Sequence, residues 1–232
     1  MSRFPKYERA GAYHWGKLSN RSLRGYHARL WARYGWFNEH IAQRSGLVID
    51  VGAGDAALTH LLCNADRAVI GIEPEPDALA VGADALAAVG SSARLMLGDA
   101  YALPFADGEA SVVVMCEVIE HLDRPDDAVA EAARVLGSSG ELLISTPNAQ
   151  PALADPFHVH EFTASELCEL IGRHFREVGV WVAEPGWLLS AYRWRAGRIV
   201  VNMAAFAGAN PFRYCITSTR PQWRQLYARA HR

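Results

Sequence analysis

The chain has 232 residues, of which 50% are hydrophobic and 21% are charged. This length and composition fit one globular α/β domain, and no internal repeat or low-complexity stretch interrupts it. The first six residues lack the apolar core of a secretory signal. The longest weakly polar run, residues 199–209, is far shorter than the roughly 20 residues of a membrane-spanning helix. The four widely spaced cysteines form no C-x-x-C pair, which predicts buried thiols in a reducing cytoplasm rather than a zinc or redox site.

The net charge of −2 is unevenly distributed along the chain. Residues 1–46 sum to +7, residues 47–185 to −17 and residues 186–232 to +8. Two interpretations stay open. The basic flanks either pack on the acidic middle and partly neutralise it, or form a basic lid or groove suited to an anionic substrate.

Hydrophobic periodicity predicts a helix over residues 21–44, followed by a regular alternation of short apolar strands and helices. Strands are predicted at residues 47–51, 68–72, 93–97, 111–116, 141–145, 177–182 and 213–217, and helices at residues 56–63, 76–89, 126–136 and 165–173. This pattern is typical of a Rossmann-like, doubly wound and mostly parallel sheet. In such a sheet the ligand binds beyond the carboxyl ends of the strands.

The first strand runs into a glycine-rich turn with the sequence Asp50-Val51-Gly52-Ala53-Gly54-Asp55-Ala56-Ala57. Glycines at this place allow a tight turn and a close approach of the backbone to a ligand. The turn fits a dinucleotide pattern, but Asp50 would repel a pyrophosphate. A carboxylate there favours S-adenosylmethionine (SAM), which has an ammonium group and no phosphates.

Two further carboxylates follow the next two strands. Glu73 ends the second strand and can accept hydrogen bonds from ribose hydroxyls. Asp99 follows the third strand and can accept one from an adenine amine, while the backbone N–H of Ala100 meets a ring nitrogen. Together with Asp50, these residues predict a SAM site.

The fourth strand leads into Cys116-Glu117-Val118-Ile119-Glu120-His121, and a second histidine-containing segment covers residues 155–162. In a helical turn, Glu117, Glu120 and His121 face one side. Two carboxylates with one or two imidazoles can bind a divalent cation such as Mg²⁺ or Mn²⁺. Two alternatives remain: His121 is a general base without a metal, or these residues brace the loop. His158 is either a second base or a loop residue.

The chain resembles class I SAM-dependent methyltransferases, in the subgroup that includes ubiquinone-biosynthesis O-methyltransferases. The resemblance spans about residues 45–182 and is carried by five segments: residues 50–55, 71–74, 98–105, 113–122 and 140–148. It implies about seven strands, one of them antiparallel, which we place at residues 212–219. It also implies SAM contacts from Asp50, Gly52, Gly54, Glu73, Asp99, Ala100 and Glu117. Ala56 departs from the family pattern, since many members have a glycine there.

The E-x-x-E-H motif with a distant histidine is similar to metal-dependent small-RNA 3′-terminal 2′-O-methyltransferases and to some sugar methyltransferases. By this resemblance the metal ligands would be Glu117, Glu120, His121 and His160, and the catalytic residues would be His121, Glu120 and His160. Such a cation would clamp two adjacent substrate oxygens and lower the pKa of one hydroxyl.

We expect a single domain over residues 1–232, with a helical cap (1–45), a SAM-binding core (46–182), an insertion (183–212), and the last strand with a basic tail (213–232). The cap residues Tyr13, His14 and Trp15 either close over SAM and substrate or pack on the core. The aromatic and arginine-rich insertion is interpreted as a substrate lid, with a membrane-surface helix or a homodimer contact as alternatives.

The expected function is SAM-dependent O-methylation of a small polar or glycosyl-type acceptor, with a divalent cation as a further option. The alternatives are an RNA 3′-terminal 2′-O-methyltransferase and a non-catalytic partner protein with a SAM fold. The acidic middle of the chain argues against a broad nucleic-acid surface.

Overall fold

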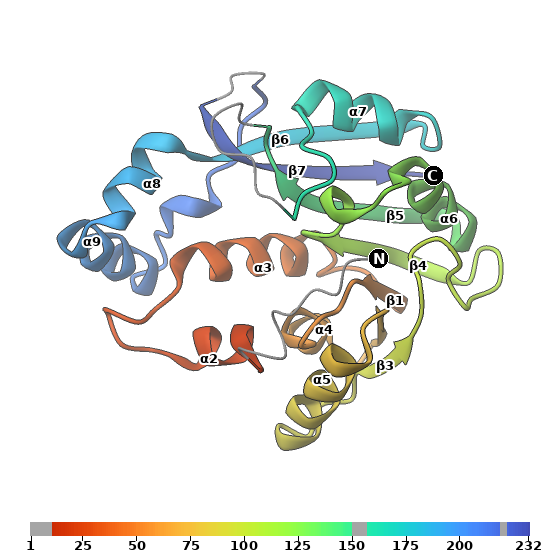
Figure 1. Ribbon diagram of the computed structural model, residues 1–232, viewed down its shortest axis with the longest axis horizontal. Helices are drawn as coiled ribbons and strands as arrows, with labels where there is room; N and C mark the ends of the chain where they lie inside the picture. The colour runs from red at the N-terminus through yellow and green to blue at the C-terminus, as the bar shows by residue number, and fades with distance from the viewer. Residues whose placement is uncertain (1–10, 150–156, 219–221) are drawn as a thin grey trace.

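The computed structural model describes residues 11–149, 157–218 and 222–232 (Figure 1). Its centre is a seven-stranded sheet in the order β3-β2-β1-β4-β5-β7-β6, in which β7 runs antiparallel to both of its neighbours. The strands are β1 (Gly46–Val51), β2 (Arg67–Glu73), β3 (Arg94–Leu97), β4 (Ala110–Cys116), β5 (Leu136–Pro147), β6 (Glu177–Pro185) and β7 (Trp223–His231). The predicted Rossmann-like sheet with one antiparallel strand is therefore confirmed.

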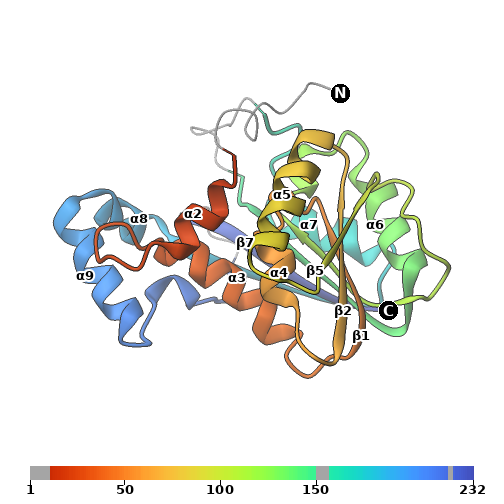
Figure 2. The same cartoon turned by 90° about the horizontal axis from the view of Figure 1, so that it is seen from below.

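Helices cover both faces of the sheet, with α2 to α5 on one face and α6 and α7 on the other (Figure 2). The helices are α2 (Tyr13–Ser19), α3 (Ala28–His40), α4 (Ala57–Leu62), α5 (Pro76–Ala88), α6 (Pro125–Val135), α7 (Ala164–Gly172), α8 (Gly186–Arg193) and α9 (Arg195–Phe206), with single 3₁₀ turns η1 (Ile119–His121) and η2 (Pro211–Arg213). Side chains alternate between the faces, as strands require. In β1, Val48 packs with α3 and α4, whereas Ile49 packs with α6 and α7.

The site lies where the strand order reverses. From β1 the chain proceeds outward through β2 to β3, then returns to place β4 on the other side of β1. The parallel register pairs Asp50 with both Gly71 and Val114, so the carboxyl ends of β1, β2 and β4 meet at one edge. Crevices at such a reversal are where doubly wound sheets bind their ligands.

The last strand lies later in the chain than predicted. Residues 211–213 form η2 instead, and Ile216 makes a single bridge to Val182, while Thr219 lies outside the described residues. The strand that pairs with β5 and β6 is Trp223–His231. The prediction of residues 212–219 was wrong because a short β-branched run after Pro211 imitates a strand.

The N-terminal helices also differ from the single helix predicted over residues 21–44. Residues 20–27 form a loop in which the Asn20 side chain accepts hydrogen bonds from the backbone and hydroxyl of Ser22. Asparagine and serine compete in this way with helical hydrogen bonding. The helical cap is therefore two helices, α2 and α3, of which α2 lies within residues predicted only as a cap.

The insertion forms α8 and α9, which pack together beside the N-terminal end of α3 (Figures 1 and 2). Two buried polar side chains fix this arrangement. Asn202 donates to the carbonyls of Leu23 and Tyr26, and the hydroxyl of Tyr192 accepts from the backbone N–H of Ala28. Among the described residues, no helix has the length and apolar character that crossing a bilayer requires.

Candidate active site

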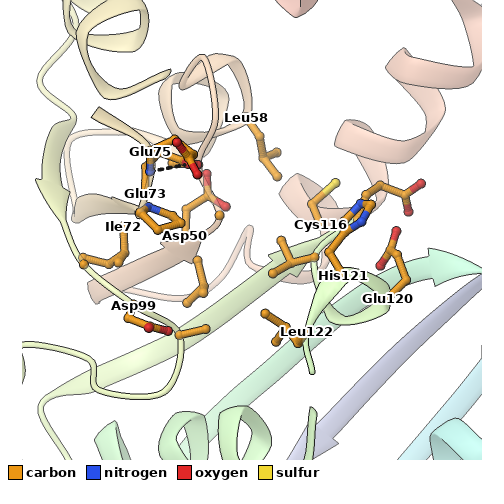
Figure 3. Close-up of a pocket in the computed structure, with 18 of the residues that line it drawn as sticks. Asp50, Leu58, Ile72, Glu73, Glu75, Asp99, Cys116, Glu120, His121 and Leu122 are labelled. Atoms are coloured by element: carbon orange, nitrogen blue, oxygen red, sulfur yellow. Dashed lines mark hydrogen bonds between the residues drawn. The ribbon is translucent and has the colours of Figure 1, made fainter. Parts of the chain in front are cut away.

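A cavity of about 500 Å³ opens at the carboxyl ends of β1 to β4 (Figure 3). Carboxylates from the first three strand ends gather on one side of it, and η1 contributes Glu120 and His121 on the other. Helix α3 and residues 157–159 complete the walls. None of the described residues of the insertion lines this cavity, so the interpretation of residues 183–212 as a substrate lid gains no support from the cavity wall.

The glycine turn after β1 has the left-handed backbone that its sequence predicts. Gly52 has a φ of 72° and Gly54 a φ of 55°. A Cβ on Gly52 would lie 2.5 Å from a methyl carbon of Val118, so a side chain is excluded there by space as well as by φ. Ala56 also adopts a positive φ, of 60°. This backbone favours glycine, the residue that many of the methyltransferases this chain resembles have at this place.

Asp50 is buried with its carboxylate at the cavity wall. One carboxylate oxygen accepts a hydrogen bond of 2.7 Å from the hydroxyl of Thr59. Burial, together with the charge of nearby Glu73, raises the pKa of Asp50 to about 7, although the hydrogen bond from Thr59 acts to lower it. A cationic ligand would reverse this effect, so the site is built to gain from binding a positive group.

Glu73 is held by two backbone N–H groups, because Gly54 donates to one oxygen at 2.8 Å and Glu75 to the other at 3.1 Å (Figure 3). Burial raises its pKa despite these bonds. The carboxylate is thereby fixed in orientation at the cavity edge. Asp99 accepts from the N–H of Tyr101 at 3.0 Å, and Asp99 and Ala100 both line the cavity as predicted.

The N-terminal segment is attached to the glycine turn through Asp55. The backbone N–H of His14 donates to one Asp55 oxygen at 2.7 Å, and the His14 ring lies 3.0 Å from the other. The indole N–H of Trp15 donates to the Asp55 carbonyl at 2.6 Å. His14 therefore forms part of the cavity wall, whereas Tyr13 does not line it.

Glu117 is part of an ion-pair network that the sequence did not reveal. One carboxylate oxygen lies 2.9 Å from a guanidinium nitrogen of Arg33, and the other accepts from Gln225 at 2.8 Å and Ser145 at 3.0 Å. Arg33 also donates to the Gln225 amide oxygen. In the sequence, Arg33 is only one of several arginines within the helix predicted over residues 21–44. The network connects α3, β4, β5 and β7 at the cavity wall.

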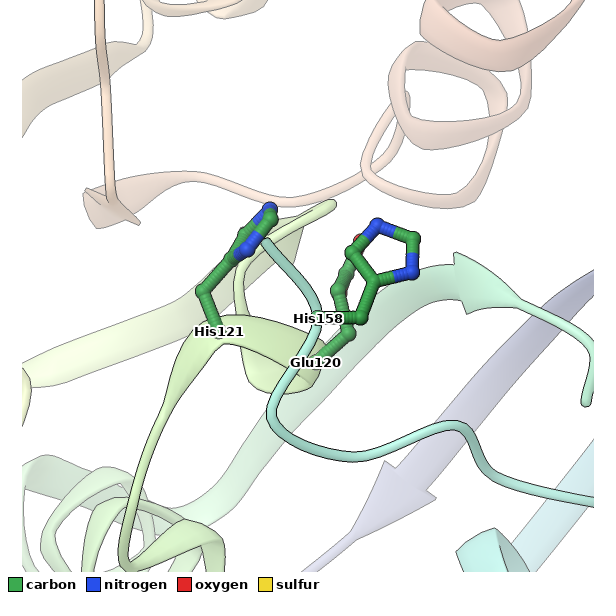
Figure 4. Close-up of side chains that lie close together, drawn as sticks. All are labelled: Glu120, His121 and His158. Carbon is green, nitrogen blue, oxygen red and sulfur yellow. The ribbon is translucent and has the colours of Figure 1, made fainter. Parts of the chain in front are cut away.

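Glu120, His121 and His158 form the second polar group of the cavity (Figure 4). One ligand-capable atom from each lies within 4.8 Å of those of the others. Glu120 is buried and accepts from Thr146 at 2.9 Å. Burial and the charge of Glu117 raise its pKa well above the ordinary value. The Nδ1 of His121 lies 2.9 Å from the Phe157 carbonyl, which makes Nδ1 the donor and Nε2 the basic nitrogen.

The predicted set of four ligands does not gather in one place. His160 is exposed beside Phe162 and does not line the cavity. Its backbone N–H and that of Val159 donate to the Glu120 carbonyl. This turn places His158, rather than His160, beside Glu120 and His121. Glu117 also lies outside this group, since its carboxylate is occupied by Arg33. Asp155 and Pro156 of the same motif lie outside the described residues.

Two imidazoles and one carboxylate are a donor set that divalent transition metals accept. Facial ligands of such an ion lie about 3 Å apart, so side-chain rotation must bring the three groups closer than 4.8 Å. The Phe157 carbonyl on His121 and the Thr146 hydroxyl on Glu120 are the outer hydrogen bonds that orient metal ligands in proteins. The set fits Mn²⁺ better than Mg²⁺, which prefers oxygen ligands.

Residues 49–144 match the model of the methyltransferase domain family. A probable SAM-dependent methyltransferase of Mycobacterium tuberculosis is 32% identical over 150 residues, which are 59% of this chain and 53% of the relative. The UbiE ubiquinone/menaquinone biosynthesis C-methyltransferase of Dinoroseobacter shibae is 33% identical over 144 residues, 58% of this chain and 56% of the relative. The matched segment thus spans little more than half the length of these curated relatives.

The solved structure of phosphoethanolamine N-methyltransferase 2 from Haemonchus contortus, in complex with S-adenosyl-L-methionine, superposes with a TM-score of 0.62. The match covers 91% of this chain and 60% of the other at 14% identity, and so concerns the fold alone. Residues 49–144 of this chain thus match a methyltransferase domain, and the similar proteins include SAM-dependent methyltransferases by name.

Proposed function

We propose that this protein is a SAM-dependent methyltransferase that transfers the methyl group to a hydroxyl oxygen of a small polar or glycosyl-type acceptor. The observation that carries the proposal is the division of the cavity. Three carboxylates suited to SAM lie on one side, and a histidine with a fixed tautomer lies on the other. A methyl transfer needs these two halves: a place for the sulfonium donor and a means of deprotonating the acceptor.

In the proposed complex Asp50 pairs with the ammonium of SAM, directly or through water. Glu73 accepts from the ribose hydroxyls, and Asp99 accepts from the adenine amine. The turn from Gly52 to Gly54 lets the backbone approach the ligand. Each of these carboxylates is already oriented by a hydrogen bond from Thr59, Gly54 or Tyr101. These side chains therefore lose little conformational freedom when the ligand binds.

At the acceptor end His121 is the proposed general base. Its Nδ1–H donates to the Phe157 carbonyl and leaves Nε2 as the proton acceptor. A hydroxyl is a weak nucleophile and has to lose its proton as it attacks the methyl group, which a base beside it makes possible. The relatives include a C-methyltransferase and an N-methyltransferase by name, so the oxygen assignment rests on this histidine and not on the fold.

A divalent cation is the alternative to His121 as general base, with Glu120, His121 and His158 as its ligands, because the single lone pair on Nε2 of His121 cannot bind an ion and accept a proton at once. When bound, such an ion would lower the pKa of an acceptor hydroxyl and hold two adjacent substrate oxygens. The residues of this chain would then orient the acceptor, and Glu120 would have to ionise. The RNA alternative gains no support here, because the cavity wall carries carboxylates where a polyanion would need cations.

The test combines Mn²⁺ titration with methyl transfer. Calorimetry should detect one Mn²⁺ site in the wild type, lost in His158→Ala and retained in His160→Ala, which is the matched control two residues away. Equal binding by both variants would contradict the ligand assignment.

Transfer of label from methyl-labelled SAM should then be followed with vicinal diols, catechols and glycosides as acceptors, and with amines beside them. His121→Ala should lower the rate about 10²- to 10⁴-fold with the SAM affinity unchanged. Label found only on amines would refute O-methylation.

A further inference from the structure

Helix α9 turns an apolar side toward solvent, contrary to the usual arrangement of a surface helix. Val200 is 65% exposed, Met203 55% and Phe206 43%, and these residues recur at helical spacing. The opposite side holds the buried Asn202, whose amide donates to the carbonyls of Leu23 and Tyr26. The orientation of α9 is therefore fixed by a buried polar anchor, and the exposed apolar side is its consequence.

Two tryptophans extend the apolar surface onto α8. Trp187 in α8 is 72% exposed, and Trp194, which joins α8 to α9, is 77% exposed. Isolated exposed apolar residues are ordinary on protein surfaces, but large aromatic side chains this exposed are not. Tryptophan is the residue enriched at the boundary between lipid and water, because its ring is apolar with one polar N–H.

Four arginines adjoin this surface. Arg24, Arg193, Arg195 and Arg198 line a hollow of about 420 Å³ together with Ile199 of α9. Arg198 rests on the ring of Tyr192 and donates to its carbonyl. Within the described ranges none of the four forms an ion pair with a carboxylate, and the chain has no acidic residue from 186 to 232. The hollow is thus a concentrated positive charge directly beside exposed apolar side chains.

We propose that α8 and α9 dock this protein onto the surface of an anionic phospholipid bilayer. The arginines would contact lipid phosphates, and Trp187, Trp194, Val200 and Met203 would enter the acyl boundary. A helix that lies in a membrane interface needs both features. Its apolar side chains insert below the headgroups, and its arginines are attracted to anionic headgroups. An RNA would use the arginines but gain nothing from Val200 and Met203. The exposed apolar side therefore favours lipid.

Helix α3 contacts the docking surface at one end and the cavity farther along. The N–H of Ala28, at the start of this helix, donates to the Tyr192 hydroxyl of α8, and Arg33 and Tyr34 farther along α3 line the cavity. No described residue of α8 or α9 lines the cavity itself. Membrane docking and SAM binding are therefore separable by substitution.

The test is co-sedimentation of the full chain with vesicles of pure phosphatidylcholine and with vesicles that contain about 30% phosphatidylglycerol, an anionic fraction that attracts basic surfaces. We expect at least tenfold stronger binding to the anionic vesicles and a blue shift of tryptophan fluorescence. Arg193→Glu/Arg195→Glu and, separately, Trp194→Ser/Met203→Ser should each weaken vesicle binding at least tenfold. The matched controls are Arg94→Glu/Arg176→Glu and Val89→Ser/Leu97→Ser, which alter exposed residues of the same kinds elsewhere and should bind like the wild type.

Calorimetry with SAM and thermal unfolding, run on every variant, separate this proposal from the proposed function. Loss of vesicle binding with SAM affinity and unfolding temperature retained supports docking even if no methyl acceptor is found. Equal binding to both vesicle types, or binding unaffected by the two docking variants, overturns it. Binding of a single-stranded RNA that Arg193→Glu/Arg195→Glu abolishes and Trp194→Ser/Met203→Ser leaves intact, without vesicle binding, also overturns it. So does a dimer that Trp194→Ser/Met203→Ser dissociates, if the wild type binds no vesicles.

Discussion

At the scale of single residues, Asp50 gives the proposed SAM site a dependence on pH. Its pKa is raised to about 7, first by burial, so the carboxyl takes up a proton as the pH falls below neutrality. A neutral Asp50 cannot pair with an ammonium. We predict that the Kd for SAM rises about tenfold between about pH 7.5 and pH 6 in the wild type, measured by calorimetry. Asp50→Asn should bind more weakly and show only the pH dependence of SAM itself.

The same raised pKa affects stability with a defined sign. The folded state holds the Asp50 proton more tightly than the unfolded chain, so its contribution to stability is present at low pH and lost as the pH rises through about 7. Asp50→Asn should therefore be more resistant to urea than the wild type at about pH 7.5, with a smaller difference at about pH 5. A parallel pH dependence of the wild type and Asp50→Asn in both experiments would contradict the account.

Gly52 is required for two reasons that a substitution can separate. An alanine there would adopt a φ of 72° and place its Cβ 2.5 Å from a Val118 methyl carbon. Gly90 has a φ of 64° and open space where a Cβ would lie, with no neighbouring atom within 4 Å, so Gly90→Ala measures the cost of φ alone. We predict that Gly52→Ala lowers the free energy of unfolding by about 1 kcal/mol more than Gly90→Ala.

Val118→Ala should recover this excess in the double variant, because it removes the methyl groups that an alanine at position 52 would meet. Urea unfolding of the four variants measures the coupling. Equal losses for Gly52→Ala and Gly90→Ala would show that space at position 52 is not limiting.

Residue-level prediction succeeded where a strand end determines the position of a side chain. Asp50 and Glu73 lie at the ends of β1 and β2, Asp99 follows β3, and the parallel register brings all three to one cavity. It failed in the loop, where His158 and His160 are separated by one residue. Two backbone hydrogen bonds to the Glu120 carbonyl determine which of these histidines lies beside Glu120 and His121. The periodicity of the sequence does not predict such bonds.

At the scale of elements, Asp55 holds α2 against the glycine turn. Its carboxylate accepts a hydrogen bond from the backbone N–H of His14 and contacts the His14 ring. Asp55 is 1% exposed. We predict that Asp55→Ala loosens α2, so that limited proteolysis cuts within residues 13–19 faster and the SAM affinity falls. Removal of a buried acceptor of this kind costs about 1–3 kcal/mol. Asp84→Ala, an exposed carboxylate on α5, is the control and should behave like the wild type. Unchanged cleavage in Asp55→Ala would mean that other contacts hold α2.

Most elements could be predicted because parallel strands buried on both faces read as continuous apolar runs. The exception among the strands, β7, has the sequence W-R-Q-L-Y-A-R-A-H, in which polar residues interrupt the apolar pattern on both faces. Gln225 is buried there because it donates to Glu117 and to the Thr146 carbonyl. A strand whose buried positions include a glutamine is recognised only when its partners are known, and so residues 212–219, with β-branched Ile216, Thr217 and Thr219, were predicted instead.

At the scale of the whole molecule, the two basic flanks pack in different places. The first flank contributes Arg33 to the cavity wall and Arg29 to the buried Glu184, which partly neutralises the acidic middle. The second flank places arginines at the hollow between α8 and α9, away from the cavity. The interpretation that the flanks pack on the acidic middle therefore holds in part, whereas a basic groove for an anionic substrate stays a prediction, since none of the described arginines of the insertion lines the cavity. Net charge along a sequence does not reveal this division, because it depends on the packing of α8 and α9 against α3.

The most direct test of the account is a calorimetric titration of the full chain with SAM, repeated with Glu73→Gln, Asp99→Ala and the exposed control His160→Ala. The account predicts saturable one-to-one binding by the wild type, weakened at least tenfold by each change at the acidic side of the cavity and unchanged in the control. Absence of binding, or binding that Glu73→Gln and Asp99→Ala leave intact, would contradict the claim that this cavity is a SAM site.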